Sequence, residues 1–305
     1  MKMHLASSNL ESSGKSVPRG RGNSPQRTPP AVLRHSPPTV SAGIPTASRR
    51  APRPSRDATL VLGAIPQETD LVNWALSGKR RGTLGGFPYV RGMLAGRPTI
   101  VAVTGIGKTN ASLISTLFVG HFRPRQVIMT GTASRINPGV RNGDVIVGEV
   151  TCNHDFGSLG RNYAMEYFGA EGPLGDSSPI VYPGDARLLA AAKRAIRHHV
   201  PEVARHHSPP YTPGVRLGRI TSGDQFGITP GRIRDIRRRL RPDLMEMESG
   251  SVAQVCWYLR TPFICVRGGS NRTQDRPDND YRKLSPFAAR QAALFTVSLI
   301  GELGR

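Results

Sequence analysis

Two glutamates separated by one residue, Glu246 and Glu248, have the types and spacing that most directly suggest chemistry. In an extended segment, residues two apart point to the same side of the chain. The neighbouring segments are apolar, so a solvated surface does not readily explain two carboxylates on one face. Carboxylates accept hydrogen bonds from hydroxyl groups and can act as general bases. We therefore interpret this pair as a candidate for ligand binding or catalysis.

Small and polar residues follow most of the apolar runs in the sequence. Glycine lets a ligand approach the backbone, and Thr, Ser, Asp and Asn supply hydrogen bonds. One such end indicates a turn, whereas six of them indicate a shared pocket. The six are Gly63-Ala64, Thr104-Gly105-Ile106-Gly107, Thr130-Gly131-Thr132-Ala133, Ser222-Gly223-Asp224, Glu246-Met247-Glu248 and Gly268-Gly269-Ser270-Asn271.

Short apolar runs must supply the framework that positions these residues. Near-continuous apolar runs of this length are typical of strands buried on both faces. The runs cover residues 59–65, 98–105, 126–133, 144–153, 216–223 and 262–269. Between them, helical patterns cover 108–121, a segment capped by Asp185, 249–259 and a last helix opening at Ser285-Pro286. This alternation predicts an α/β domain, residues 57–305, around a mostly parallel sheet with ligands at the carboxyl ends of its strands.

The first 56 residues differ in composition from the rest of the chain. They hold ten Lys and Arg and one acid, Glu11, which is +9 of the formal net charge of +21. The segment is rich in Ser and Pro and has no apolar period, so we predict that it is disordered. Three interpretations stay open: an organelle transit peptide, a loose contact with nucleic acid or an anionic surface, or a solvated extension without function. No apolar region follows the basic residues as a secretory signal requires.

Composition excludes several classes of protein. Three cysteines without a CxxC pair exclude a disulfide-stapled scaffold and a zinc ribbon. No window reaches the roughly 18 apolar residues of a membrane helix. We expect no membrane partner, no metal and no cofactor, and a cytoplasmic location, with an organelle as the alternative if the tail is a transit peptide.

In order and spacing, several of these segments resemble the nucleoside phosphorylase/nucleosidase superfamily. Within this superfamily, the segments resemble those of the 5'-methylthioadenosine/S-adenosylhomocysteine (MTA/SAH) nucleosidases and futalosine hydrolases. The resemblance implies a three-layer αβα fold with a mixed sheet, and a homodimer. It covers about 59–303 and rests on Gly63-Ala64-Ile65-Pro66-Gln67-Glu68, Thr104-Gly105-Ile106-Gly107-Lys108, Thr130-Gly131-Thr132-Ala133, Gly143-Asp144-Val145-Ile146-Val147, Asn153-His154-Asp155, Ser222-Gly223-Asp224-Gln225-Phe226 and Glu246-Met247-Glu248.

The resemblance implies roles in cleaving an N-ribosidic bond, a reaction that passes through an oxocarbenium-like sugar, as glycoside hydrolysis does. By resemblance, Glu248 accepts hydrogen bonds from the ribose hydroxyls, and Met247 packs against the sugar. Glu68 activates water as a general base, although taken alone it could be a surface turn residue. Phe226 stacks on the purine, and Glu246 helps to orient the ribose or water site.

The segment that binds the base departs from the family pattern. The family has Arg-x-x-Ser-Asp, whereas this chain has Asn271 in place of the Asp. An amide cannot deliver a proton, but it can donate to O6 and N7 of a 6-oxopurine, which are both acceptors. Asn271 therefore favours hypoxanthine or guanine over adenine. Thr104, Gly105 and Gly131 complete the predicted substrate-binding set.

The sequence leaves four possible functions open. The first is a nucleosidase that hydrolyses a purine nucleoside; the acid at Glu68 favours it, because a carboxylate there repels phosphate. The second is a purine nucleoside phosphorylase. The third is a catalytically impaired homologue that binds nucleosides, suggested by Asn271 and the altered loop at 132–135. The fourth, a nucleic-acid-binding protein, rests on charge alone.

Overall fold

Strands and helices alternate along the chain, as the apolar runs predicted. The computed structural model describes residues 57–159, 165–167, 181–273 and 277–304. These all belong to the unit that spans residues 51–305, and the predicted tail, 1–56, lies outside them. The strands are β1 (Thr59–Gly63), β2 (Ser77–Leu84), β3 (Phe87–Leu94), β4 (Arg97–Val103), β5 (Gln126–Arg135), β6 (Val145–Asn153), β7 (Gly157–Leu159), β8 (Met165–Tyr167), β9 (Val181–Pro183), β10 (Val215–Ser222), β11 (Leu244–Glu246) and β12 (Phe263–Arg272). The helices are α1 (Pro66–Ala75), α2 (Lys108–Phe122), α3 (Ala186–His198), α4 (Pro230–Leu240), α5 (Ser249–Tyr258) and α6 (Pro277–Glu302).

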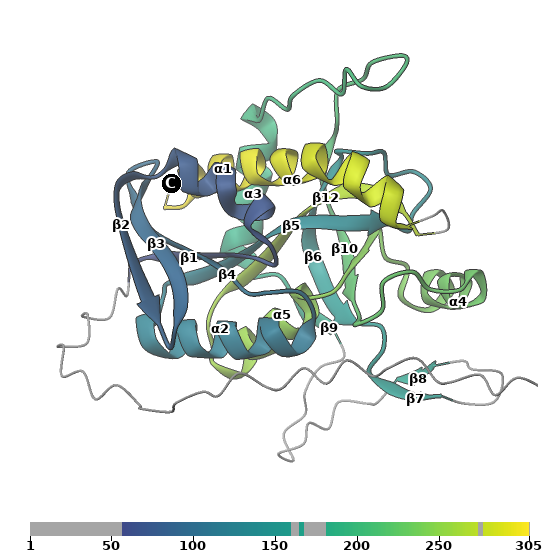
Figure 1. The fold of residues 1–305 in the computed structure, drawn as a ribbon, viewed down its shortest axis with the longest axis horizontal. Coiled ribbons are helices and arrows are strands. Elements are labelled where there is room, and N and C mark those ends of the chain that lie inside the picture. Colours follow the sequence, from purple (N-terminus) through teal and green to yellow (C-terminus); the bar gives the residue numbers. More distant parts are fainter. Residues whose placement is uncertain (1–56, 160–164, 168–180, 274–276, 305) are drawn as a thin grey trace, which may run out of the picture. The chain divides into compact units, whose positions relative to one another are not determined.

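A ten-stranded mixed sheet runs through the described residues in the order β11-β10-β6-β12-β5-β1-β4-β3-β2, with β9 beside β6 (Figure 1). Its centre is parallel: β1 pairs with β4 and β5, and β5 pairs with β12. All five residues of β1 are buried, as expected for a strand covered on both faces. The carboxyl ends of these strands therefore meet at one edge of the sheet, where ligands are expected.

The short strand β11 joins two distant parts of this sheet. It pairs in parallel with β10 and in antiparallel with β5, where Met245 lies opposite Ser134. Because β5, β12, β6 and β10 are already neighbours, this second pairing closes the five strands into a ring. The closure brings the Glu246–Glu248 segment next to the ends of β5 and β12.

Helices cover both faces of the sheet (Figure 1). On one face, α1 and α3 pack against α6, and the three helices cover a core that includes Val61, Ile128 and Val266. On the other face, α2 and α5 pack together over Leu62 and Met129. Successive residues along the central strands thus point alternately into two apolar layers, as Val61 and Leu62 do. The predicted three-layer αβα fold is confirmed.

Two elements differ from the sequence prediction. The last helix begins at Pro277 and not at Ser285, so Pro286 lies inside α6. A proline within a helix forfeits one backbone hydrogen bond, and α6 packs on β12. The second difference is the hairpin of β2 and β3, whose turn residues Gly85 and Gly86 both have positive φ. Such a two-glycine turn favours a hairpin, and it is a signal that the sequence did contain.

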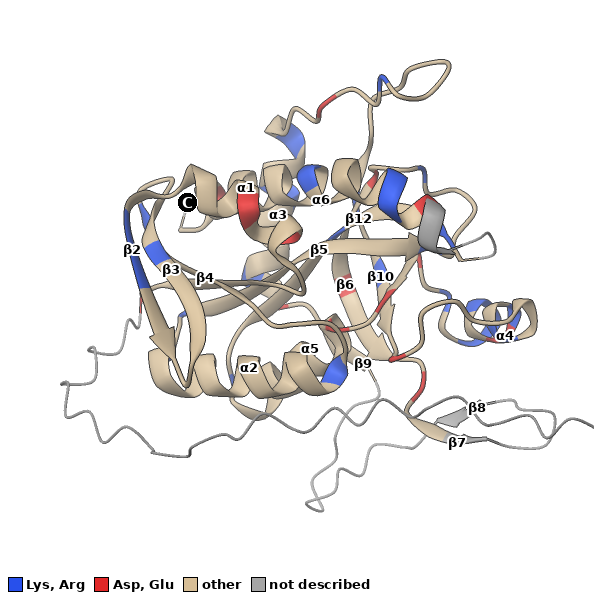
Figure 2. Ribbon diagram, viewed as in Figure 1, with Lys and Arg blue, Asp and Glu red and all other residues tan. Residues whose placement is uncertain are grey.

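The arginine-rich segment 232–241 forms most of α4, a surface helix (Figure 2). Its single acid, Asp235, accepts hydrogen bonds from Arg232, Arg238 and Arg239 at 2.9, 3.1 and 2.8 Å. These contacts balance part of the positive charge of the helix within the helix itself. No helix in the described ranges is both long enough and apolar enough to span a membrane.

Candidate active site

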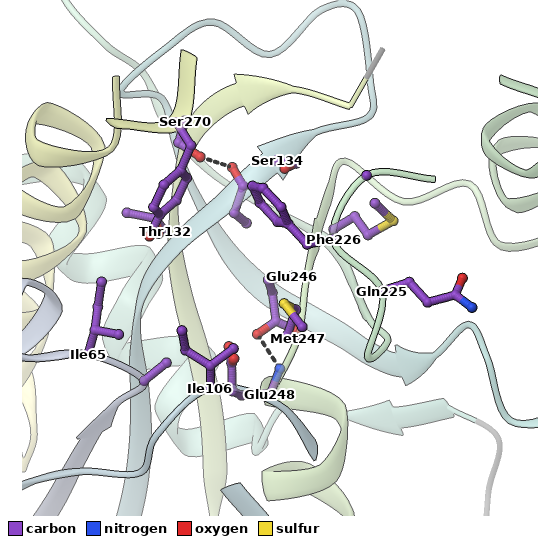
Figure 3. Close-up of a pocket in the computed structure, with 15 residues that line it drawn as sticks. Ile65, Ile106, Thr132, Ser134, Gln225, Phe226, Glu246, Met247, Glu248 and Ser270 are labelled. Atoms are coloured by element: carbon purple, nitrogen blue, oxygen red, sulfur yellow. Dashed lines mark hydrogen bonds between the residues drawn. The ribbon is translucent and has the colours of Figure 1, made fainter. Parts of the chain in front are cut away.

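A cavity of about 300 Å³ lies at the carboxyl ends of the central strands (Figure 3). Its volume is at the lower end of the range for small-molecule sites, which runs from about 300 to 1,000 Å³. Five of the six glycine-rich or polar strand ends contribute to its wall, all but Ser222-Gly223-Asp224. The lining residues are Ala64, Ile65, Ile106, Thr132, Ala133, Ser134, Gln225, Phe226, Gly227, Met245, Glu246, Met247, Glu248, Ser270 and Tyr281.

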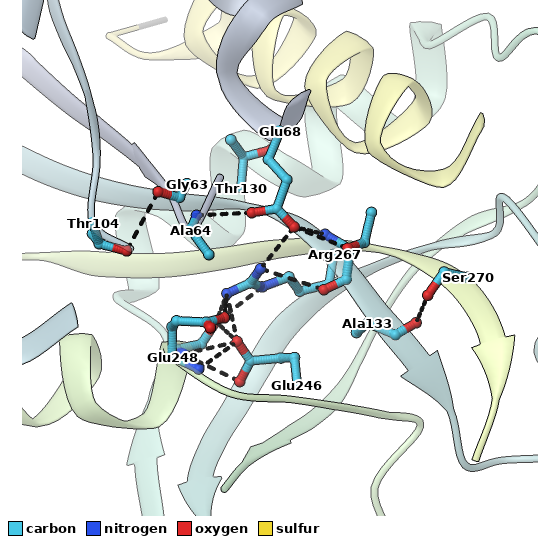
Figure 4. Close-up of polar contacts among 12 residues, drawn as sticks. Gly63, Ala64, Glu68, Thr104, Thr130, Ala133, Glu246, Glu248, Arg267 and Ser270 are labelled. Atoms are coloured by element: carbon cyan, nitrogen blue, oxygen red, sulfur yellow. Dashed lines mark hydrogen bonds and ion pairs between the residues drawn. The ribbon is translucent and has the colours of Figure 1, made fainter. Parts of the chain in front are cut away.

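One fully buried arginine, Arg267, joins three carboxylates beside this cavity (Figure 4). Its Nη1 lies 3.7 Å from Glu68 Oε1, and its Nη2 lies 3.3 Å from Glu248 Oε2. The same Nη2 pairs closely with Glu246 Oε2. Burial alone disfavours a charged guanidinium, but the three carboxylates more than offset this and raise the pKa of Arg267. Three acids from α1, β11 and the start of α5 are thus held around one cation.

Glu68 stands in the first turn of α1, with its carboxylate buried behind the cavity wall. Oε2 accepts from the backbone N–H of Ala64 at 2.8 Å. Oε1 accepts from the N–H and the hydroxyl of Thr132 at 2.7 and 2.9 Å. Both donors belong to residues that line the cavity. Glu68 is therefore no surface turn residue: its charge is fixed in place by the wall of the pocket.

Glu246 has the densest hydrogen bonding of the three acids. It accepts from the backbone N–H of Glu248 at 3.0 Å and from the N–H and hydroxyl of Ser249 at 2.9 and 3.0 Å. The Ser222 hydroxyl also donates to it. With Arg267 added, both oxygens are occupied by the protein. The structure thus gives Glu246 the task of positioning Arg267 and the start of α5, although it also lines the cavity.

Glu248 is the acid with the most capacity left for a ligand. It precedes α5 as the N-cap residue, and its Oε1 accepts from the backbone N–H of Gly107 at 3.0 Å. Burial and the neighbouring charge of Glu246 raise the pKa of Glu248 to about 8, although Arg267 opposes this. A carboxyl in this state gains from any ligand hydroxyl that donates to its ionised form.

The raised pKa of Glu248 gives a pH prediction. If the ionised carboxylate holds the substrate, kcat/KM should rise about tenfold for each pH unit up to about 8 and then level off. The charged groups that face Glu248 are Arg267, Glu246 and Glu68. A kcat/KM that is flat between pH 6 and 9 would contradict the assignment.

Asn271, at the end of β12, is buried directly behind the lining residues Ser134 and Ser270. Its Oδ1 accepts from the Ser134 hydroxyl at 3.2 Å and from the Ser270 hydroxyl at 3.0 Å. The amide nitrogen is therefore the donor end, and one of its hydrogens goes to the carbonyl of Arg272 at 3.3 Å. Asn271 itself is not among the lining residues, so a ligand meets it only past the two serines.

Aromatic rings form one wall of the cavity. Phe226 is 46% exposed and lies edge-on to Tyr281, with ring centroids 5.8 Å apart. The hydroxyl of Tyr281 is 3.4 Å from the Thr132 hydroxyl. Tyr281 comes from α6, far along the sequence, and was absent from the predicted set. Together with Met247 and Ile106, these rings give the cavity apolar surfaces suited to a flat, partly apolar ligand.

The remaining predicted residues lie behind the wall. The Thr104 hydroxyl donates to the carbonyl of Gly105 at 2.8 Å, and the Gly105 N–H donates to the carbonyl of Ala64 at 3.0 Å. Neither residue is part of the lining, and nor is Gly131. A Cβ at Gly131 would collide with Arg267 and with the carboxylate of Glu68. Gly131 therefore serves the ion cluster by leaving room for it.

Comparison with known proteins agrees with this fold. The family model of the Phosphorylase superfamily matches residues 59–301. The chain belongs to this superfamily, and its predicted resemblance is confirmed.

Three relatives illustrate the relation. An MTA/SAH nucleosidase of Lysinibacillus sphaericus is 28% identical over 80% of this chain and 98% of its own length. The crystal structure of the Neisseria meningitidis MTA/SAH nucleosidase with methylthio-immucillin-A has a TM-score of 0.69 at 29% identity, covering 81% of this chain and all of that one. Helicobacter pylori futalosine hydrolase has a TM-score of 0.68 at 22% identity, covering 81% of this chain and 98% of that one, which shows a shared fold.

Proposed function

We propose that the protein is a purine nucleosidase that hydrolyses the N-ribosidic bond of a 5'-modified purine nucleoside. The observation that carries the proposal is the cluster of Glu68, Glu248 and Arg267 beside a cavity of about 300 Å³. The predicted class of enzyme, an N-glycosyl hydrolase acting on purine nucleosides, is confirmed by relatives that are MTA/SAH nucleosidases. The roles of the individual residues and the choice of substrate are our proposal.

In this proposal Glu248 and Glu68 divide the work. Glu248 accepts hydrogen bonds from the ribose hydroxyls, supported by its open carboxylate at the cavity. Glu68 takes a proton from the attacking water, supported by its fixed position behind Ala64 and Thr132. Arg267 keeps the acids within reach of one another. The aromatic wall of Phe226 and Tyr281 receives the base.

The charge of the cavity favours water over phosphate as the nucleophile. Glu246 and Glu248 line it, and none of the lining residues is Lys or Arg. The nearby Lys108 forms an ion pair with Asp155 at 2.5 Å, so it is engaged elsewhere. A phosphate dianion entering this cavity would meet carboxylates, and the nearby cation Arg267 is already paired with Glu68, Glu246 and Glu248. This supports hydrolysis, and a phosphorylase is the alternative that an assay must exclude.

Base release from a panel of nucleosides tests the proposal. The panel consists of inosine, adenosine, MTA, SAH and futalosine, each incubated with the full chain in phosphate-free buffer. We expect free purine from at least one 5'-modified member. Tight binding of these nucleosides without any base release would instead indicate the impaired homologue. Predicted homodimer formation stays a prediction, and a contact of the tail with nucleic acid lies outside the described residues.

The amide of Asn271 gives a prediction about the base. Two serine hydroxyls hold its oxygen, which leaves a nitrogen donor for the acceptors of a 6-oxopurine. The Asn271→Asp variant restores a group that can carry a proton to N7. It should move the ratio of kcat/KM for adenine over 6-oxopurine nucleosides upward by about ten- to a hundredfold. The ratio is measured with adenosine against inosine, and an unchanged ratio defeats the argument for base selection.

A further inference from the structure

A second cavity, of about 420 Å³, opens at the amino-terminal ends of β1, β4 and β5. Since these three strands are parallel, this is the opposite edge of the sheet from the candidate active site. The lining residues are Asp57, Thr59, Gly96, Arg97, Pro98, Arg125, Gln126, Arg187, Leu188, Ala190, Ala191, Arg194, Leu303 and Gly304. Four of them are arginines and one is an acid.

Helix α3 supplies two of the arginines from a single face. Arg187 and Arg194 are seven residues apart, which is about two helical turns or roughly 10 Å. Ala190 and Ala191 lie between them on the same face and also line the cavity. Their small side chains leave open space between the two guanidinium groups. The helix thus presents two cations with a gap between them.

The sheet supplies the other two arginines. Arg97 begins β4 and Arg125 directly precedes β5, and these strands flank β1 on either side. Two strand spacings separate them, about 10 Å. Within the described part of the chain, no ion pair joins either guanidinium to a carboxylate. The Arg97 guanidinium lies against Gly304, where an added Cβ would approach its Nη1 to 2.9 Å.

The arginines of α3 differ from these two because acids outside the lining contact them. Arg194 donates to the carbonyl of Glu302 at 2.9 Å and lies 3.4 Å from its carboxylate. Arg187 lies 3.7 Å from Asp185. One pair of cations is thus anchored, whereas Arg97 and Arg125 have no carboxylate partner among the residues that the structure describes. Clustering like charges is unfavourable in the absence of an anion.

We propose that this cavity binds a small ligand that carries two or more phosphate groups. Arginine contacts phosphate through two parallel hydrogen bonds, and four guanidinium groups, from α3, from β4 and from the residue before β5, can hold more than one phosphate at once. The apolar floor, which includes Leu188 and Leu303, suits the rest of such a molecule. The site is separate from the candidate active site and does not depend on the function proposed for it.

Calorimetric titration of the full chain at physiological ionic strength tests this site. The probes are inorganic tripolyphosphate and adenosine triphosphate, which separate a phosphate chain from a nucleotide as the source of the shared chemistry. The test variant is Arg97→Gln with Arg125→Gln. The control is Arg80→Gln with Arg81→Gln, two exposed arginines of β2 that change the net charge equally. Thermal melting of both variants checks that they fold.

We expect both probes to bind the wild type and the control alike, and the test variant to bind at least about tenfold more weakly. Tighter binding of the nucleotide than of tripolyphosphate would identify a nucleotide, and equal binding would identify the phosphate chain alone. The proposal is overturned if neither probe binds the wild type. It is equally overturned if the test and control variants lose affinity to the same extent, because the probes would then bind through the net charge of the protein and not through this cavity.

Discussion

Replacing Arg267 by methionine should destabilise the protein more than any other single change in the site. The variant leaves the carboxylates of Glu68, Glu246 and Glu248 buried together without their cation. Removing one partner of a buried ion pair costs about 3–5 kcal/mol. For a domain of this size that corresponds to a fall in Tm of about 6–20 °C. Thermal unfolding followed by circular dichroism measures it.

The loss of stability in Arg267→Met should increase as the pH rises. Without Arg267, the carboxylates are easier to protonate in the folded state than in the unfolded chain, so stability falls as the pH rises. The fall in Tm is therefore expected to be larger at pH 8 than at pH 5. Arg272→Met is the matched control, because Arg272 is on the same strand but exposed. Equal melting of the two variants at both pH values would show that Arg267 does not balance the acids.

The Glu68→Gln variant should lower the rate of base release by about a hundred- to ten-thousandfold, the range attributed to general bases. It replaces one carboxylate oxygen by an NH2 group while keeping the size of the side chain. Binding of a nucleoside should change little, because Glu248 and the aromatic wall remain. Single-turnover release of purine measures the rate, and calorimetry measures the affinity.

The structure adds a control to this experiment. Both Glu68 oxygens accept hydrogen bonds from backbone N–H groups, those of Ala64 and Thr132. In Glu68→Gln the new NH2 group must therefore point at one of these two N–H donors. An unsatisfied pair of this kind costs about 1–3 kcal/mol. Thr132→Val removes the hydroxyl contact to Glu68 and keeps its charge, and it should retain most of the activity. If Glu68→Gln were as active as Thr132→Val, Glu68 would not be the base.

The sequence predicted the parts of the site that repeat a local pattern. Each buried parallel strand ends in small or polar residues, so Thr132, Ser270 and the Glu246–Glu248 segment could be placed at one edge of the sheet. The family motifs added Glu68, which no local pattern distinguishes from a surface residue. Its burial depends on the turn from β1 into α1, where Ala64 and Thr132 surround the carboxylate.

Two parts of the site depend on tertiary contacts that the sequence does not show. Arg267 was not assigned a role, although an arginine within a strand buried on both faces needs a buried acid as partner. That argument would have linked it to Glu246 and Glu248. Tyr281 offered no such signal, because the start of α6 was predicted eight residues too late. The pairing of β11 with β5 was equally hidden, since it joins segments about 110 residues apart.

The identity of the sugar product tests the central claim most directly. The full chain and a 5'-modified purine nucleoside that it cleaves are incubated with saturating phosphate, and the sugar is identified by mass spectrometry. We predict the free ribose derivative, formed at a rate that added phosphate does not change, and formed at least about a hundredfold more slowly by Glu68→Gln. A sugar 1-phosphate formed only when phosphate is present would contradict hydrolysis and make the protein a phosphorylase.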